Sequence, residues 1–220
     1  MPRTARASVG GVCYHVINRG NAGLQVFRKA GDFRAFVDLI AAANERLPMR
    51  VLAYCLMPTH FHMVLCPHKD RDLSLWMQWL MTSHVRRYHK NHETSGHVWQ
   101  GRFKAFPIQE DAHLLTVLRY VERNPLRAAL TERADEWPWS SYFARLHGPS
   151  DFLADWPIDR PRDWAARLNR PETDKDLEAL RTSVNRGAPF GSPDWSRLTA
   201  RRLGLEASLR PRGRPGKAKK

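Results

Sequence analysis

Apolar and polar residues follow two spacings along the chain, and each spacing predicts one type of secondary structure. Residues 12–19 alternate between the two kinds, as a half-buried strand does. Residues 32–47 repeat phenylalanine and aliphatic side chains at helical spacing, and Asp32 is expected to be the N-cap of that helix. Two further strands are expected at 49–56 and 60–66, joined at the segment MPTH.

The same alternation of patterns continues to about residue 124. It predicts a helix at 73–92, a loop at 95–103, a short strand at 104–110 and a third helix at 111–124. Pro107 places the short strand at a sheet edge, because proline cannot donate to the ladder. Asp111 is expected to cap the third helix, and Pro125 to end or kink it.

This order of elements predicts the fold class. A β-α-β-β-α-β-α succession indicates an α+β protein of a largely antiparallel sheet with helices packed on it. The composition changes after about residue 145, where proline, aspartate and tryptophan become frequent. We therefore divide the chain into a domain at 1–145, a C-terminal extension at 146–205 with helices at 174–185 and 194–204, and a basic tail at 206–220 that is too poor in apolar residues to fold alone.

The net charge of the chain indicates what kind of partner it binds. The chain has 36 Lys and Arg against 22 Asp and Glu, a net charge of +14, which favours a polyanionic partner. Nucleic acid is the first candidate and an anionic membrane surface the second. Without an apolar run of about 20 residues or the apolar core of a signal peptide, the protein is expected to be cytoplasmic. Three cysteines in apolar runs are expected to be buried free thiols: Cys13, Cys55 and Cys66.

Two histidines stand out in the strand at 60–66. His60 and His62 share one face of the strand, whereas Phe61 and Met63 share the other. Two imidazoles on one rigid face can hold a divalent metal ion, and Phe61 would then anchor the strand in the core. The alternative is a pair of half-exposed histidines on a solvated sheet face.

The third predicted helix offers partners for this pair. Tyr120 and Asn124 are four residues apart and so share a helix face. A carboxamide oxygen is a suitable ligand for Mg²⁺ or Mn²⁺, and a phenol can act as a nucleophile toward a phosphoester. The alternative for Tyr120 is packing at the edge of the core. Motifs of zinc deaminases, P-loop ATPases and α/β-hydrolases are absent from the sequence.

Several basic and aromatic residues are candidates for DNA contact. Basic side chains that could line a groove for a phosphate backbone are Arg86, Arg87, Lys90, Arg102 and Lys104, although a solvated helix face explains such residues equally well. Trp99 and Phe103 could stack on unpaired bases or pack in the core. The tail contains Arg212-Gly213-Arg214-Pro215, which has the core of a minor-groove motif, and a non-specific basic tail is the alternative.

Four blocks together resemble a known family. They are YHVINRGN (14–21), YCLMPTHFHMVL (54–65), GHVWQGRF (96–103) and RYVERNPLRA (119–128). In this order they are similar to blocks of the REP-associated tyrosine transposases, which are single-tyrosine members of the HUH (His-hydrophobic-His) transposase superfamily. The resemblance covers about residues 8–145, and GAPFGSPDW, ARRLGL and LRPRGRP resemble the C-terminal region of the same family.

The resemblance implies a ferredoxin-like HUH nuclease fold and a mechanism. His60, His62 and Asn124 would hold Mg²⁺ or Mn²⁺, and Tyr120 would cleave single-stranded DNA through a 5′-phosphotyrosine and transfer the strand. The substrate would be a palindromic hairpin of the repeated extragenic type, and the protein would be a monomer or homodimer associated with the nucleoid. Two alternatives stay open: a DNA-binding regulatory or architectural protein without required nuclease activity, and a structural RNA-binding module.

Overall fold

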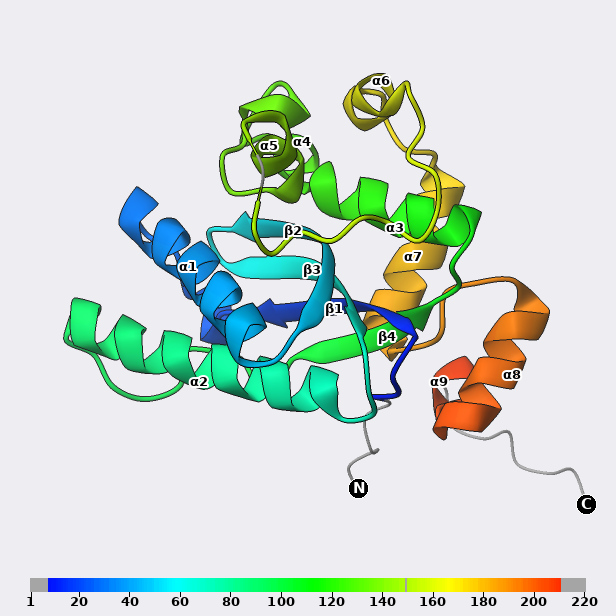
Figure 1. Ribbon diagram of the computed structural model, residues 1–220, viewed down its shortest axis with the longest axis horizontal. Helices are drawn as coiled ribbons and strands as arrows, with labels where there is room; N and C mark the ends of the chain where they lie inside the picture. Colours follow the sequence, from blue (N-terminus) through cyan, green and yellow to red (C-terminus); the bar gives the residue numbers. More distant parts are fainter. Residues whose placement is uncertain (1–7, 149, 211–220) are drawn as a thin grey trace, which may run out of the picture.

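A four-stranded antiparallel sheet is the centre of the fold (Figure 1). The computed structural model describes residues 8–148 and 150–210. The strands are β1 (Cys13–Arg19), β2 (Met49–Met57), β3 (His60–Pro67) and β4 (Lys104–Ile108), in the order β2-β3-β1-β4. Each neighbouring pair is antiparallel. β4 is an edge strand, as Pro107 predicted.

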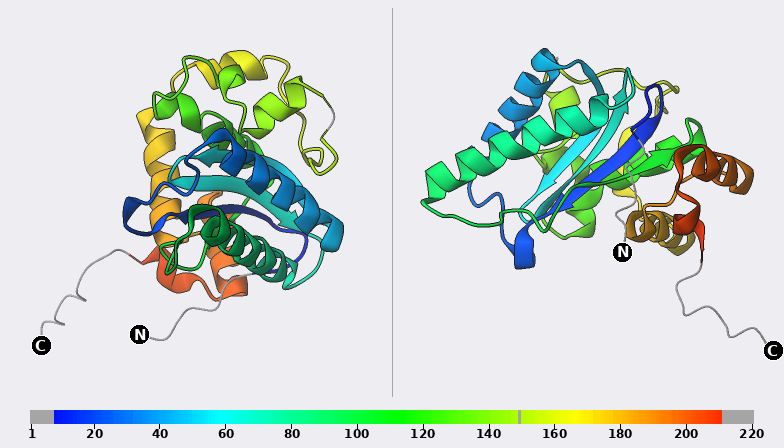
Figure 2. Two further views of the ribbon diagram at one scale, coloured as in Figure 1. Left: turned by 90° about the vertical axis from the view of Figure 1, so that its left-hand side faces the viewer. Right: turned by 90° about the horizontal axis from the view of Figure 1, so that it is seen from below.

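Three helices, which follow β1, β3 and β4 in the chain, cover both faces of the sheet. They are α1 (Ala30–Arg46), α2 (Asp72–His92) and α3 (Ala112–Glu122). α1 and α2 lie side by side on one face, and α3 packs on the other (Figures 1 and 2). Because β1 lies between β3 and β4, the β-α-β-β-α-β order is that of a split, ferredoxin-like sheet. The predicted α+β fold class is confirmed.

The strands alternate their side chains between two apolar clusters. The cluster under α1 and α2 receives Tyr14 and Val16 from β1 and Phe61 from β3, and the cluster under α3 receives Ile17 and Val64. Phe61 is fully buried against Phe36 and Trp99, in agreement with its predicted anchoring role. The strand β3 is therefore held by one face, which leaves the other face to display different chemistry.

The helix boundaries correct one predicted N-cap and confirm another. α1 begins earlier than expected: Lys29 is the N-cap, and the Asp32 carboxylate accepts hydrogen bonds from the backbone N–H groups of Arg28 and Lys29. Asp32 is thus the third residue of the helix rather than its cap, as in a capping box. Asp111 caps α3 as predicted, accepting a hydrogen bond from the His113 N–H.

The region after residue 123 consists of further helices, several of which pack on the α3 side of the sheet. These are α4 (Asn124–Arg127), α5 (Ser141–Leu146), α6 (Trp164–Asn169), α7 (Asp174–Arg186), α8 (Pro193–Leu203) and α9 (Glu206–Leu209), with a 3₁₀ turn at Ala134–Glu136. Another 3₁₀ turn, at Asn21–Gly23, follows β1. Phe190 pairs with Ile108 of β4, and the Trp156 indole N–H donates to the Leu52 carbonyl. The C-terminal extension therefore contributes to the core under α3.

Two further expectations concern the basic tail and membrane-spanning helices. The predicted basic tail at 206–220 begins with the helix α9, and its remaining part at 211–220 lies outside the described residues. Within 8–148 and 150–210, no helix combines the length and apolar character needed to cross a membrane.

Candidate active site

The two predicted histidines lie at the start of β3 and face α3. Their ring centroids are 5.1 Å apart. His62 is buried and His60 is half-buried, so the pair sits at the boundary between the core and the surface. Because β3 is an inner strand of the sheet, both neighbours hold its backbone in place.

Tyr120 lies directly across from this pair. It is in the last turn of α3, its ring centroid is 5.5 Å from that of His62, and its side chain is largely buried. The packing of α3 on β2 and β3 brings the two elements together. The structure thus unites His60, His62 and Tyr120, which the sequence singled out on separate elements.

A third histidine belongs to the same cluster and was not singled out from the sequence. His15 on β1 is fully buried, and its Nε2 atom lies 2.9 Å from Nδ1 of His62. Its ring also stands 5.9 Å from that of Tyr120. A signal existed: the alternation in β1 places His15 on the same face as Ile17, but only the β1–β3 pairing brings that face to His62.

The hydrogen bonds of the histidines leave the same ring atom free on both. His62 uses Nδ1 toward His15, and His60 uses Nδ1 toward the Thr59 hydroxyl at 3.1 Å. A neutral imidazole that donates from Nδ1 has an unprotonated Nε2, the form that binds a metal ion. For His62 this requires His15 to accept with Nε2 and to carry its own proton on Nδ1, which has no partner among the described residues.

Burial keeps these rings neutral. It lowers the pKa of His60 to about 4 and the pKa of His15 to about 3, and it holds the pKa of His62 well below its usual value. The guanidinium of Arg127 lowers each pKa further because it disfavours a second positive charge nearby. Neutral imidazoles are the ligands that a divalent ion needs.

Asn124 also reaches this cluster, but by a different route from the one predicted. α3 ends at Glu122, and Asn124 begins the separate short helix α4, so the expected continuous helix face is interrupted just before Pro125. The buried Asn124 accepts a hydrogen bond on Oδ1 from Arg127 at 2.8 Å. Its Nδ2 atom has no partner among the described residues.

Arg127 is a further member of the cluster that the sequence analysis missed. Its guanidinium lies 3.8 Å from the centre of the Tyr120 ring and also pairs with Glu172 at 3.4 Å. Arg127 is in α4, which follows α3 after the single residue Arg123. A cation at this position is attracted to the aromatic ring and to any anion bound beside it.

The donor set fits a divalent cation. Two neutral imidazoles with free Nε2 atoms and a buried carboxamide are ligands that Mg²⁺ or Mn²⁺ accepts. The Asn124 oxygen is engaged by Arg127, so it would be available to a metal ion only after Arg127 releases it.

A pocket of about 410 Å³ opens beside Tyr120 and His62. Three basic residues line it: Arg19 at the end of β1, Arg102 in the loop before β4 and Lys104 at the start of β4. All three side chains are exposed, so a phosphate backbone could reach them. Asn185 of α7 forms part of the opposite wall.

The other predicted DNA-contact residues lie elsewhere. Arg86, Arg87 and Lys90 are on α2, which covers the opposite face of the sheet from Tyr120 (Figure 2). Trp99 and Phe103 are buried in the cluster under α1 and α2, which favours core packing over base stacking. Arg212 and Arg214 lie outside the described residues.

Comparison with known proteins places the chain in a family. Residues 8–124, just over half of the chain, match the family described as "Transposase IS200 like". The chain belongs to the IS200-like transposases. The match begins just before β1 and ends at Asn124, so it contains every residue of the cluster except Arg127.

Two further proteins are similar to the chain. A Haemophilus influenzae protein, provisionally named REP-associated tyrosine transposase, is 29% identical over 109 residues, 44% of this chain and 61% of the relative, so the match spans about six-tenths of the relative's length. The solved structure of a REP-associated tyrosine transposase bound to a REP hairpin is 18% identical with a TM-score of 0.56, covering 72% of this chain and 95% of the other. The first match agrees with the resemblance seen in the four sequence blocks, and the second confirms the fold.

Proposed function

We propose that the chain is a metal-dependent endonuclease and strand transferase that acts on single-stranded DNA through Tyr120. The observation that carries the proposal is the tyrosine ring 5.5 Å from the neutral His62, next to His60 and at the wall of a basic pocket. A nucleophile, two metal ligands and a phosphate-binding surface are the parts that phosphoryl transfer requires.

The reaction follows from the position of the phenol. The Tyr120 oxygen attacks the scissile phosphorus and forms a phosphotyrosine ester, while the bond between phosphorus and the 3′ oxygen breaks and leaves a free 3′-OH. The phenol proton is lost and the leaving oxygen gains one, so the proton balance is zero. The ester retains the energy of the phosphodiester, and a second 3′-OH can attack it to complete strand transfer without a nucleotide cofactor.

His60, His62 and Asn124 would hold the Mg²⁺ or Mn²⁺ ion that polarises the scissile phosphate. Arg127 has a second task in this proposal. It releases the Asn124 oxygen, and its positive charge stays beside Tyr120, where negative charge collects on the attacking oxygen and the phosphate. Arg19, Arg102 and Lys104 would bind the neighbouring backbone phosphates.

The proposed substrate is a DNA hairpin with a single-stranded flank. The likeness to a fold that was solved with a REP hairpin supports this choice, and the exposed basic residues beside the pocket suit a phosphate backbone. A single-stranded flank is needed because the scissile phosphate has to enter the pocket beside the buried Tyr120.

Incubation with a labelled palindromic oligonucleotide and Mn²⁺ tests the proposal. The wild-type protein is expected to form a covalent protein–DNA adduct that survives a denaturing gel, and Tyr120→Phe is expected to form none. Tyr88→Phe is the matched control, because Tyr88 is similarly buried but lies under α1 and α2. An adduct in Tyr120→Phe would exclude Tyr120 as the nucleophile. Hairpin binding by the wild type without an adduct, in Mg²⁺ and in Mn²⁺, would favour a regulatory or architectural protein instead.

A further inference from the structure

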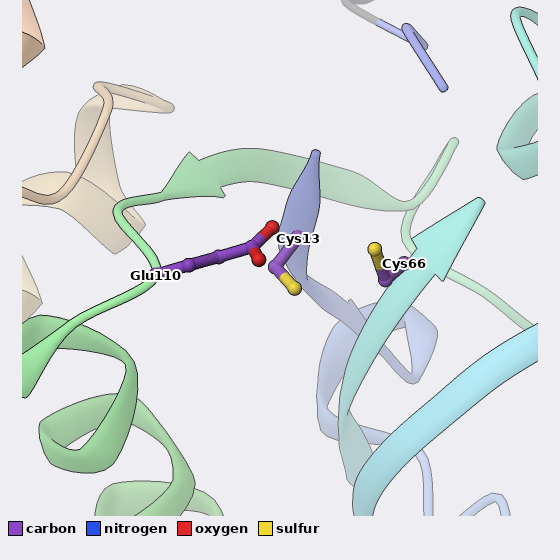
Figure 3. Close-up of side chains that lie close together, drawn as sticks. All are labelled: Cys13, Cys66 and Glu110. Carbon is purple, nitrogen blue, oxygen red and sulfur yellow. The ribbon is translucent and has the colours of Figure 1, made fainter. Parts of the chain in front are cut away.

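A second group of ligand-type side chains lies at the other end of the same strands (Figure 3). Cys13 of β1, Cys66 of β3 and Glu110 of the segment between β4 and α3 converge, and their sulfur and carboxylate atoms all lie within 4.8 Å of one another. The two cysteines are buried, whereas Glu110 is exposed and gives access from solvent. All three cysteines of the chain are free thiols.

The register of the sheet sets the two cysteines against each other. Tyr14 pairs with Leu65, so Cys13 is directly opposite Cys66. At the far end of the same register, the Gly20 N–H donates to the Thr59 carbonyl at 2.7 Å, which makes the even-numbered positions of β1 the hydrogen-bonded pairs. Cys13 and Cys66 therefore form a non-hydrogen-bonded pair, the type in which side chains approach most closely.

One basic residue lies beside the pair and enters the charge balance of a bound cation. The Arg50 guanidinium lies 3.7 Å from the Cys66 sulfur. Two thiolates and the Glu110 carboxylate would carry three negative charges, which a divalent cation and Arg50 would balance. A balanced total charge matters most at a buried site, because an uncompensated charge there is costly.

We propose that Cys13, Cys66 and Glu110 form a binding site for one thiophilic divalent cation of the zinc class. Two sulfur ligands and one oxygen ligand suit such an ion, with a fourth position open to water. The site is separate from the histidine cluster, because Cys66 is four residues beyond His62 on β3, a distance of about 13 Å in a strand. Mg²⁺, which prefers oxygen ligands, would not select it.

A cation bound here would stabilise the elements that carry the candidate active site. Glu110 directly precedes Asp111, the N-cap of α3, and α3 carries Tyr120 at its other end. The ion would thus join β1 and β3, which carry the three clustered histidines, to the segment that leads into α3 and Tyr120. We expect bound zinc to raise the melting temperature of the full-length protein.

Cobalt(II) is a suitable probe, because its bonds to thiolates give a charge-transfer absorption that nitrogen and oxygen ligands do not. Metal-free, reduced full-length protein is expected to develop this band at one Co²⁺ per chain and to lose it when Zn²⁺ is added. The His60→Ala/His62→Ala double variant is expected to keep the band, which separates this site from the histidine cluster. Absence of the band in the wild type would overturn the proposal.

Variants locate the ligands. Cys13→Ser and Cys66→Ser are expected to lose the band, whereas Cys55→Ser, a buried cysteine outside the group, keeps it. Glu110→Gln changes an exposed side chain, so folding is retained, and Co²⁺ affinity should fall by about tenfold or more, at least as much as loss of an outer-shell partner costs. Unchanged affinity in Glu110→Gln would overturn the ligand set. A count of one free thiol instead of three in protein purified without reductant would identify a Cys13–Cys66 disulfide and overturn the proposal.

Discussion

His62 and His84 are both buried histidines, and they lie on opposite faces of the same sheet. Burial lowers the pKa of both. His84 of α2 is surrounded by rings, with centroids 5.0–5.5 Å away for Phe27, Phe36 and Trp99, and its Nδ1 atom has no partner among the described residues. His62 instead has His15, His60 and Tyr120 as neighbours.

The difference shows that burial and a lowered pKa do not by themselves mark an active site. On the α1 and α2 face a histidine serves as one more aromatic ring in the core. On the α3 face the same residue type has a hydrogen bond that orients it, a potential nucleophile beside it and a pocket that reaches it. The neighbours, and not the lowered pKa, separate a candidate ligand from a packing residue.

Substitutions of His62 and His84 are expected to differ most in their effect on DNA cleavage. His62→Ala should reduce cleavage by about a thousandfold or more, because loss of a metal ligand removes several kcal/mol of transition-state stabilisation. Hairpin binding should change little, since the ligands act on the scissile phosphate. His84→Phe should cleave at the wild-type rate. Gel assays of adduct formation and of binding measure both quantities, and equal loss of cleavage in the two variants would remove the distinction between the faces.

A smaller effect is expected from His15, which contacts His62 rather than the proposed metal ion. His15→Phe keeps the aromatic contact with Phe106 but removes the hydrogen bond to His62. Cleavage at limiting Mn²⁺ should fall by about 10–100-fold, the usual cost of losing an outer-shell partner of a metal ligand. The Mn²⁺ concentration for half-maximal rate should rise, and His15→Gln, which retains an acceptor, should recover part of the loss. An unaltered Mn²⁺ dependence in His15→Phe would mean that His15 only fills space.

The pH dependence of stability tests the other face. Burial lowers the pKa of folded His84 to about 3, against 6.5 for a histidine in the unfolded chain. Its contribution to stability is fully present above pH 6.5 and is lost as the pH falls toward 3, because only the unfolded state then takes up the proton. The loss is up to about 1.4 kcal/mol per pH unit in that window. Urea unfolding at about pH 7 and about pH 5, on either side of the unfolded pKa, should show a smaller pH dependence in His84→Phe than in the wild type. Equal pH dependence would show that His84 does not resist protonation.

The smallest effect concerns the basic residues on the two faces. Replacing Arg102 and Lys104 by Gln should reduce the salt dependence of hairpin binding, with the logarithmic slope falling by about 0.7 for each phosphate of single-stranded DNA that the variant no longer neutralises. The same change at Arg86 and Arg87 on α2 should leave the slope unchanged. Binding isotherms at several salt concentrations measure both pairs. A fall at Arg86 and Arg87 that matches the fall at Arg102 and Lys104 would extend the DNA surface to both faces.

Local patterns in the sequence predicted much of this protein. Alternation placed His60 and His62 on one strand face and Phe61 on the other, and Pro107 indicated the edge strand. Helical spacing located α1, α2 and α3 to within a few residues. These features depend on backbone geometry over a few neighbouring residues. The local pattern of apolar and polar residues is sufficient to predict that geometry.

Only the tertiary structure decided which of these faces meet. The sheet order β2-β3-β1-β4 brings His15 to His62 and Cys13 to Cys66, and the packing of α4 after α3 sets Arg127 over the Tyr120 ring. It also buried Trp99, which the sequence left open to base stacking. Contacts between residues far apart in the chain depend on strand order and on how helices pack over a shared core. No short-range periodicity encodes that order, so the sequence supplied His60, His62, Tyr120 and Asn124 as candidates, and only the fold added His15 and Arg127 to them.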